Sequence, residues 1–326
     1  ASDVYKRQPW NLSAQKNITI SSVEILNSII ESTKTAQTEN KENLRDVLSG
    51  SDIKKITDSI SSEYKKLADR DELYNFRKNI RRKKLTASDL DSIYKKFRDS
   101  NIGEDFLNRI SRGVCLFCLA GTADTIDHYL PKSIFPELSI EIYNLIPSCD
   151  VCNRKKSTYS PKSKESQLIH PYFNKIDFNS RWMYSYPNEK FLKDPSSRAI
   201  VFEVICDDNF INKSDKERLK NHFDKLKLND RYDKKVRDEL FTVYKLLSGL
   251  PDVEGNAEYR KEYLYEISEQ RKKEAVESGE YSYKGMGDNW WKSVFLEGLA
   301  ESEWYCEEGY KILAEKIDKA SYDELQ

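Results

Sequence analysis

Two stretches carry the most informative pattern of this 326-residue chain: CLFCLAGTADTIDHYLPKS, residues 115–133, and NLIPSCDVCNRKK, residues 144–156. They hold two Cys-x-x-Cys pairs with thirty residues between them, formed by Cys115, Cys118, Cys149 and Cys152. A Cys-x-x-Cys turn presents two thiolates at the spacing that tetrahedral zinc requires, so two such turns form a closed four-cysteine site. The pattern predicts a structural zinc ion that stabilises the fold and, having no open coordination position, takes no part in catalysis.

The insert between the pairs exceeds the ~15–20 residues of simple zinc ribbons, which indicates that it has a role of its own. It contains His128 directly after Asp127, and Asn153 follows the last cysteine. Carboxylate and amide oxygens suit a hard divalent cation, and a neutral imidazole can accept a proton. We therefore expect Asp127 and Asn153 to offer oxygens to one cation while His128 stays free as a base.

The order of these residues resembles that of a known family. The succession Cys-x-x-Cys, Asp-His-x-x-Pro-Lys-Ser, Asn-Leu-x-Pro-x-Cys-x-x-Cys-Asn-x-x-Lys is similar to HNH endonucleases of the ββα-metal class. The resemblance implies that Asp127 ligates the catalytic metal and that His128 activates water. It also implies that Asn144 orients this histidine and that Asn153 completes the metal site. Many members have His at the last position, and Asn there suits Mg2+ or Mn2+ better than softer metals.

Basic residues follow the motif directly. Arg154, Lys155 and Lys156 are expected to contact phosphates of DNA flanking the cleaved bond, and Lys156 also matches the terminal lysine of the family. The resemblance thus implies hydrolysis of DNA phosphodiester bonds, with His128 removing a proton from water that attacks in line. The spacing Pro-Lys-Ser-x-Phe-Pro-Glu and the later His-Pro-Tyr-Phe look like HNH proteins of Septu-type bacterial anti-phage systems, in which the nuclease works beside an ATPase.

Three other functions fit parts of the pattern. A stand-alone restriction or mobile-element endonuclease would carry the same motif. A non-catalytic zinc-knuckle module that binds nucleic acid would keep the cysteines but would not need Asp127, His128, Asn144 and Asn153 together. A thiol redox protein would need an exposed Cys-x-x-Cys near a βαβ pattern, which the sequence lacks.

Apolar periodicity predicts helices on both sides of this segment. Ser21 and Glu24 have capping-box spacing, as do Thr86 and Asp89, and each pair precedes an apolar stripe. The run 199–206 is the best strand candidate. The expected fold class is therefore mainly α with a small embedded α+β module of the ββα-metal type, stabilised by zinc.

These predictions divide the chain into four parts. They are an N-terminal helical region at 9–112, the HNH module at 113–165, a mixed strand and helical region at 166–284, and an acidic, aromatic helical segment at 285–326.

Composition excludes several other classes of protein. Hydrophobic residues make up 38 % and charged residues 33 % of the chain, which rules out collagen and wholesale disorder. No stretch approaches the ~18 consecutive apolar residues of a membrane span, and the first thirty residues lack the layout of a signal peptide. Six cysteines are too few for a disulfide scaffold in a chain of this length. We expect a cytoplasmic protein without membrane contact.

The net charge of −1 hides an asymmetry. Residues 254–326 hold 18 acidic and 10 basic side chains, a balance of −8, so the remainder of the chain is +7. The acidic region is poorly suited to DNA and is rich in aromatic residues, so we hypothesise that it docks a second copy of the chain or an ATPase partner. The alternative is that its aromatic residues complete the helical core. These residues are Trp290, Trp291, Phe295, Trp304 and Tyr310.

Three other features each allow a functional and a structural interpretation. His222 falls on the apolar stripe of its helix, where a satisfied core histidine is the expectation. His170 lies downstream of the motif and either approaches the active site or packs in the core. The basic run at 77–84 either binds a DNA backbone or forms a solvated helix face.

Overall fold

The computed structural model describes most of the chain, in two units. The described residues are 18–32, 43–77, 85–176, 181–206, 211–250, 256–277 and 283–323. Contacts divide the chain into an N-terminal unit, residues 10–176 with 217–222, and a C-terminal unit, residues 177–216 with 223–326. Most of the basic run, at 78–84, lies outside the described residues.

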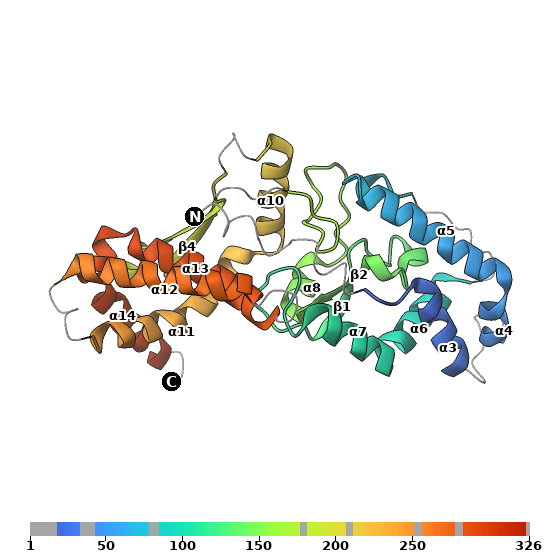
Figure 1. Ribbon diagram of the computed structural model, residues 1–326, viewed down its shortest axis with the longest axis horizontal. Helices are drawn as coiled ribbons and strands as arrows, with labels where there is room; N and C mark the ends of the chain where they lie inside the picture. The colour runs from blue at the N-terminus through green and yellow to red at the C-terminus, as the bar shows by residue number, and fades with distance from the viewer. Residues whose placement is uncertain are drawn as a thin grey trace. The chain divides into compact units, whose positions relative to one another are not determined.

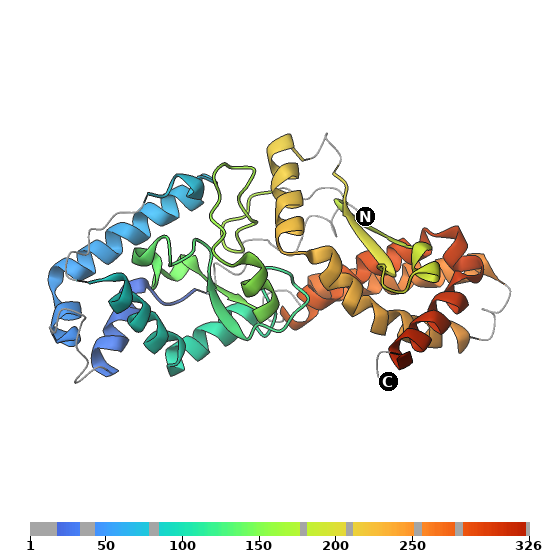
Figure 2. The ribbon, with the colours of Figure 1, turned by 180° about the vertical axis from the view of Figure 1, so that it is seen from behind.

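A ββα module begins after the first cysteine pair and ends with the helix that carries the second pair at its start (Figures 1 and 2). Strand β1, Thr125–His128, pairs antiparallel with β2, Leu145–Ser148, and helix α8, Asp150–Lys156, follows directly. The short 3-10 helices η2, Pro136–Leu138, and η3, Ile142–Asn144, lie in the connection between the strands. The predicted fold class is confirmed, since a small α+β module sits within a mainly helical chain.

Helices of the same unit surround this module. Ser21 and Glu24 exchange the two hydrogen bonds of a capping box at the first described helix, and Thr86 and Asp89 do the same further along, as their spacing predicts. The buried faces of these helices pack against one another and against the module. The helices are α3 (Ser22–Ser32), α4 (Leu44–Ser49), α5 (Ser51–Ala68), η1 (Leu73–Asn75), α6 (Ala87–Arg98) and α7 (Asn101–Ser111).

The C-terminal unit combines a second hairpin with helices. Its strands β3, Met183–Pro187, and β4, Ile200–Val204, pair antiparallel, and β4 lies within the stretch predicted as a strand. Figure 1 shows two of its helices, α12 and α13, side by side along their length. The helices are α9 (Lys190–Lys193), α10 (Lys213–Lys225, shared with the N-terminal unit), α11 (Leu228–Ser248), α12 (Ala257–Glu277), α13 (Tyr283–Ala300), the π-helical turn η5 (Tyr305–Gly309) and α14 (Tyr310–Asp323).

Aromatic side chains form the core of the C-terminal unit. The rings of Trp182 and Trp290 stack with centroids 5.2 Å apart, and Trp291 stacks on Tyr232 at 6.0 Å. A Cβ on Gly298 would lie 2.0 Å from the carbonyl oxygen of Ser185, so glycine allows α13 to approach β3 this closely. The burial of the two tryptophans within this unit supports the core alternative for them over the docking hypothesis.

None of the helices in the described part of the chain has the length and apolar character that a membrane span requires.

We predict that Trp291→Ala strongly destabilises the C-terminal unit. Trp291 is 1 % exposed and stacks on a buried tyrosine, so truncation leaves a large cavity and should lower the free energy of unfolding by about 3–5 kcal/mol. Urea titration followed by circular dichroism measures this loss. Leu246→Ala, at a residue that is 46 % exposed on α11, is the control and should change stability by about 0.5 kcal/mol or less. Equal stability of both variants would contradict the core assignment.

Candidate active site and zinc site

The four cysteines of the two pairs converge as the sequence predicts. Their sulfur atoms all lie within 4.8 Å of one another, and all four side chains are buried. In the first pair, the amide of Leu119 donates to the carbonyl of Cys115 at 2.9 Å, and Leu119 takes a positive φ of 55° to close the turn. In the second pair, Cys149 caps α8 and its sulfur accepts the amide of Cys152 at 3.5 Å.

This cluster suits zinc chemically. The pKa of Cys149 lies far below its ordinary value, because the neighbouring thiols of Cys115, Cys118 and Cys152 donate hydrogen bonds to its sulfur. Four sulfurs at this separation match a tetrahedral thiolate site, and thiolate is the form that binds the metal. The four cysteines therefore can hold one zinc ion.

His222 supports the first cysteine turn from outside the motif. Its Nε2 donates to the carbonyl of Phe117, between the two cysteines of the pair, at 2.9 Å. Its Nδ1 accepts the amide of Ile169 at 3.2 Å. Both ring nitrogens are thus satisfied inside the core, which is the structural interpretation of this residue.

Asp127 and His128 lie together at the end of β1, opposite Ile146 and Leu145 of β2. The Oδ1 atom of Asp127 accepts the amide of His128 at 2.7 Å. Its Oδ2 atom lies 3.2 Å from the ammonium of Lys156, which is fully buried on α8. Burial raises the pKa of Asp127, and the charge of Lys156 opposes this effect.

His128 is held in one tautomer. Its Nε2 lies 3.0 Å from the carbonyl oxygen of Ser139, and because a carbonyl can only accept, Nε2 carries the proton and Nδ1 keeps a lone pair. Burial lowers the pKa of His128 to about 3, so the ring is neutral at pH 7. The ring of Tyr94 packs against it at 4.4 Å between centroids, and the Tyr94 hydroxyl donates to the carbonyl of Ile126.

Asn144 fixes the loop that carries this carbonyl. Its Oδ1 accepts the amide of Leu130 at 2.7 Å and the hydroxyl of Tyr64 at 3.2 Å. Its Nδ2 donates to the carbonyls of Leu130 at 3.0 Å and of Leu138 at 3.3 Å. The Leu138 carbonyl immediately precedes Ser139, so Asn144 is linked to His128 through the backbone of the loop and not through its ring.

The polar residues of α8 divide into two faces. Asn153 is half-buried and lies one turn before Lys156, the residue of α8 that contacts Asp127 of β1. Arg154 and Lys155 are exposed, and Arg154 pairs with Asp150 one turn earlier. The structure thus separates the three basic residues of the motif, placing Lys156 inside beside Asp127 and the other two at the surface.

The donor set around Asp127 fits a hard divalent cation. The buried Oδ2 atom of Asp127 receives no hydrogen bond from the described residues, although Lys156 lies at ion-pair distance. Asn153, with an amide oxygen, lies three residues before Lys156 on α8, a spacing that places both residues on the same side of the helix. Carboxylate and amide oxygens are the ligands that Mg2+ and Mn2+ prefer.

Two tyrosines at the site carry no sequence signal. In the sequence, Tyr64 of α5 and Tyr94 of α6 look like ordinary residues of amphipathic helices. In the structure, Tyr64 contacts Asn144 and Tyr94 contacts His128. The His170 interpretation gains a contact of the same kind, because its Nε2 lies 3.1 Å from the Tyr64 hydroxyl and its Nδ1 accepts the amide of Tyr172. His170 is therefore connected to the site only indirectly, through the Tyr64 hydroxyl that also contacts Asn144.

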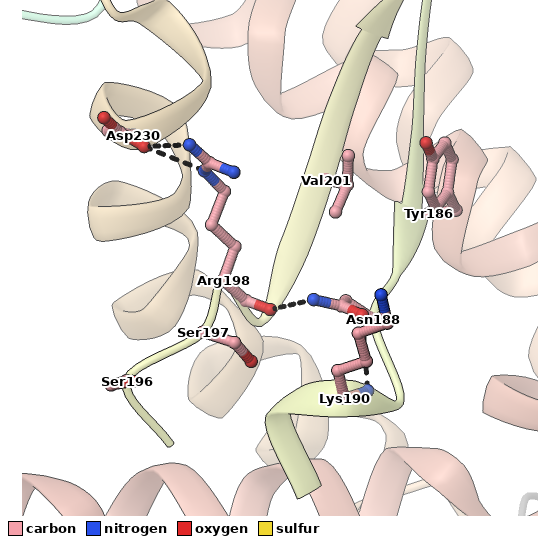
Figure 3. Close-up of a pocket in the computed structure, with 8 residues that line it drawn as sticks. All are labelled: Tyr186, Asn188, Lys190, Ser196, Ser197, Arg198, Val201 and Asp230. Atoms are coloured by element: carbon pink, nitrogen blue, oxygen red, sulfur yellow. Dashed lines mark hydrogen bonds and ion pairs between the residues drawn. The ribbon is translucent and has the colours of Figure 1, made fainter. Parts of the chain in front are cut away.

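A shallow pocket of about 690 Å³ in the C-terminal unit offers no comparable set of residues (Figure 3). Arg198 donates to Asp230 at 2.8 Å, and Asn188 donates to the carbonyl of Arg198 at 2.8 Å. Its main polar groups thus satisfy one another.

Comparison with known proteins identifies the class of the chain. The family model for HNH endonuclease matches residues 113–158, which contain the zinc cluster and the Asp127–His128 pair. The chain is 32 % identical over 231 residues to protein ea31 of Escherichia phage lambda, an alignment that covers 67 % of this chain and 74 % of that protein. It is also 34 % identical over 70 residues to Septu protein PtuB of Bacillus thuringiensis, covering 20 % of this chain and 26 % of PtuB. No solved structure matches the chain significantly.

The chain therefore belongs to the family of phage lambda protein ea31 and contains an HNH endonuclease domain. The similarity to the Septu protein supports the Septu-type resemblance within the shared segment.

We predict that Cys149→Ser removes the zinc ion and unfolds the insert locally. A structural zinc site of this size contributes ~10–16 kcal/mol to folding, and three thiolates with one hydroxyl bind zinc poorly. Elemental analysis measures zinc per chain, and hydrogen exchange measures protection over residues 113–158. Cys306→Ser is the matched control, because Cys306 is equally buried but lies outside the cluster, and it should keep its zinc. A Cys149→Ser protein with full zinc content would refute the site.

We predict that acid destabilises the protein partly through its buried histidines. Burial lowers the pKa of His222 to about 4, whereas the unfolded chain protonates this residue near 6.5. The unfolded state therefore binds more protons between these values. The free energy of unfolding should fall by about 1.4 kcal/mol per pH unit for this residue as pH decreases from 6.5 to 4.

Comparison with His222→Gln isolates this contribution. Glutamine keeps a donor for Phe117 but does not titrate, so urea titrations at several pH values should give the variant a shallower decrease than wild type. Parallel curves for the two proteins would show that His222 is protonated equally in the folded and unfolded states.

Proposed function

We propose that this protein is a metal-dependent endonuclease that hydrolyses DNA phosphodiester bonds. The observation that carries the proposal is the Asp127–His128 pair at the end of β1. There a neutral imidazole, whose Nδ1 receives no hydrogen bond from the described residues, lies beside a buried carboxylate that contacts Lys156 of α8. Such a pair supplies a proton acceptor and an oxygen ligand next to one another. Asp127 and Asn153 are the proposed ligands of a catalytic Mg2+ or Mn2+, and the four cysteines hold structural zinc.

The proposed reaction uses each residue in a distinct role. When bound, the divalent cation would polarise the scissile phosphate and stabilise the departing oxygen. His128 accepts a proton from the attacking water at Nδ1, while the Ser139 carbonyl holds Nε2 and fixes the ring. Asn144 keeps this carbonyl in place by binding the loop backbone. A phosphate anion beside the imidazole favours its protonated form, which raises the low pKa of His128 and makes it a stronger base.

Two exposed cations fit the flanking phosphates. Arg154 and Lys155 project from the surface of α8, where basic side chains also suit the helix C-terminus. Lys156 is buried against Asp127, so its proposed task is to balance the charge of this carboxylate. A reducing cytoplasm, which keeps the cysteines available for zinc, is the compartment that fits these roles.

A role in bacterial anti-phage defence is the biological setting that we favour. The support is the similarity of 70 residues of this chain to Septu protein PtuB, together with the Septu-type motif spacing. An ATPase partner belongs to this proposal, whereas a self-sufficient phage or mobile-element nuclease would act without one. The similarity to a phage lambda protein is the observation that supports this alternative setting.

We predict that His128→Ala lowers DNA cleavage by about 10²–10⁴-fold. Supercoiled plasmid incubated with Mg2+ or Mn2+ measures nicking and linearisation, and EDTA in excess of the catalytic metal gives the background. Zinc content should remain at the wild-type level, because His128 contacts no cysteine of the cluster in the described structure. Cleavage by the variant at the wild-type rate would refute the proposed base.

A further inference from the structure

Lys132 lies four residues after His128, in the loop that follows β1, and its ammonium is held by helix α6. The Nζ atom lies 2.5 Å from Oδ1 of Asp91 and 4.2 Å from the centre of the Tyr94 ring. An ion pair and a cation–π contact from one helix fix this side chain from two directions. Both partners lie upstream of residues 113–158, outside the HNH match.

The ring of Tyr94 contacts both Lys132 and His128 and so links this ammonium to the candidate active site. The same ring that carries Lys132 packs on His128 at 4.4 Å between centroids. Lys132 is therefore a second cation at this pair, in addition to Lys156.

The two lysines differ in access to solvent. The side chain of Lys156 is fully buried, whereas that of Lys132 is 32 % exposed. Asp91 holds Lys132 through Oδ1, while its Oδ2 pairs with Lys95 at 2.8 Å. The exposed part of Lys132 thus offers a positive charge that a bound anion can reach.

We propose that Lys132 binds a non-bridging oxygen of the substrate phosphate next to His128, and that Asp91 and Tyr94 position its ammonium there. This inference rests on the proposed nuclease function and extends its site to helix α6. A lysine ammonium acts on phosphate as a compact point charge. Because α6 holds it before substrate arrives, little side-chain entropy is lost on binding, and the charge is in place where negative charge develops in the transition state.

The test compares Lys132→Ala with Lys95→Ala. Both variants remove one ammonium from the same carboxylate, but Lys95 is 58 % exposed and, unlike Lys132, does not lie over the Tyr94 ring that contacts His128. Plasmid nicking with Mg2+ gives kcat and KM, and fluorescence anisotropy with a labelled duplex in EDTA gives DNA affinity. Lys132→Ala should lower kcat by about 10²-fold with little change in KM. Lys95→Ala should keep the wild-type kcat.

Two further variants keep the result interpretable. Lys132→Met retains an apolar stem over the Tyr94 ring, and it should reproduce the loss of kcat even if the alanine variant folds poorly. Asp91→Asn removes the ion pair but keeps the ammonium, so it should lower kcat less than Lys132→Met does. Zinc content and thermal unfolding report whether each variant is folded.

The outcomes separate this inference from the function on which it rests. Wild-type cleavage with an unchanged kcat in Lys132→Met overturns the role of Lys132 alone. A loss in Lys132→Ala that Lys95→Ala matches shows a general charge effect, which also overturns it. Absence of cleavage by the wild-type protein with either Mg2+ or Mn2+ overturns the proposed function, and this inference with it.

Discussion

The convergence of four buried sulfur atoms is the constraint on which the site depends. The module between residues 113 and 158 has two strands of four residues and a helix of seven, too little regular structure to be stable alone. The cysteine cluster joins both ends of this segment, because one pair precedes β1 and the other begins α8. Once these ends are fixed, β1 must run beside β2, and Asp127 must face α8. The thiolate cluster therefore sets the position of groups that it does not touch.

The helices of the N-terminal unit provide the remaining support, largely through polar contacts. The buried carboxylate of Glu141 accepts hydroxyl groups of Ser22 at 3.0 Å and Ser61 at 3.1 Å, which connects α3 and α5 to the loop between the strands. The Tyr64 hydroxyl of α5 donates to Asn144, and the ring of Tyr94 of α6 packs against His128. Such buried networks are costly if partly satisfied, but when complete they favour one arrangement of the backbone. The 3.0 Å approach of His128 to Ser139 depends on this single arrangement.

The local part of this design could be predicted from sequence, and the long-range part could not. Each Cys-x-x-Cys pair is a short turn, and Asp127 directly precedes His128, so these neighbours in sequence are neighbours in space. That the two pairs converge, with thirty residues between them, is predicted from the chemistry of zinc. Tyr94 and Asp91 contact the loop from more than thirty residues upstream, and in the sequence they are ordinary members of an amphipathic helix. Lys156 is an intermediate case, since helical phase alone places it on the face of Cys149 and Cys152, although the run Arg154 to Lys156 suggests three equivalent surface cations.

The buried pair of Asp127 and Lys156 is hard to explain by stability alone and fits the proposed role of Asp127 as a metal ligand. Taking two opposite charges out of water costs several kcal/mol per ion, and their attraction recovers this only with good geometry, so an apolar pair of similar size is often at least as stable. Here the Asp127 carboxylate keeps one oxygen without a hydrogen-bond donor among the described residues, which is poor geometry for stability alone. An oxygen left in this state suits a group that must accept a cation. The charge of the ammonium beside it opposes the rise in the pKa of this carboxylate that burial causes.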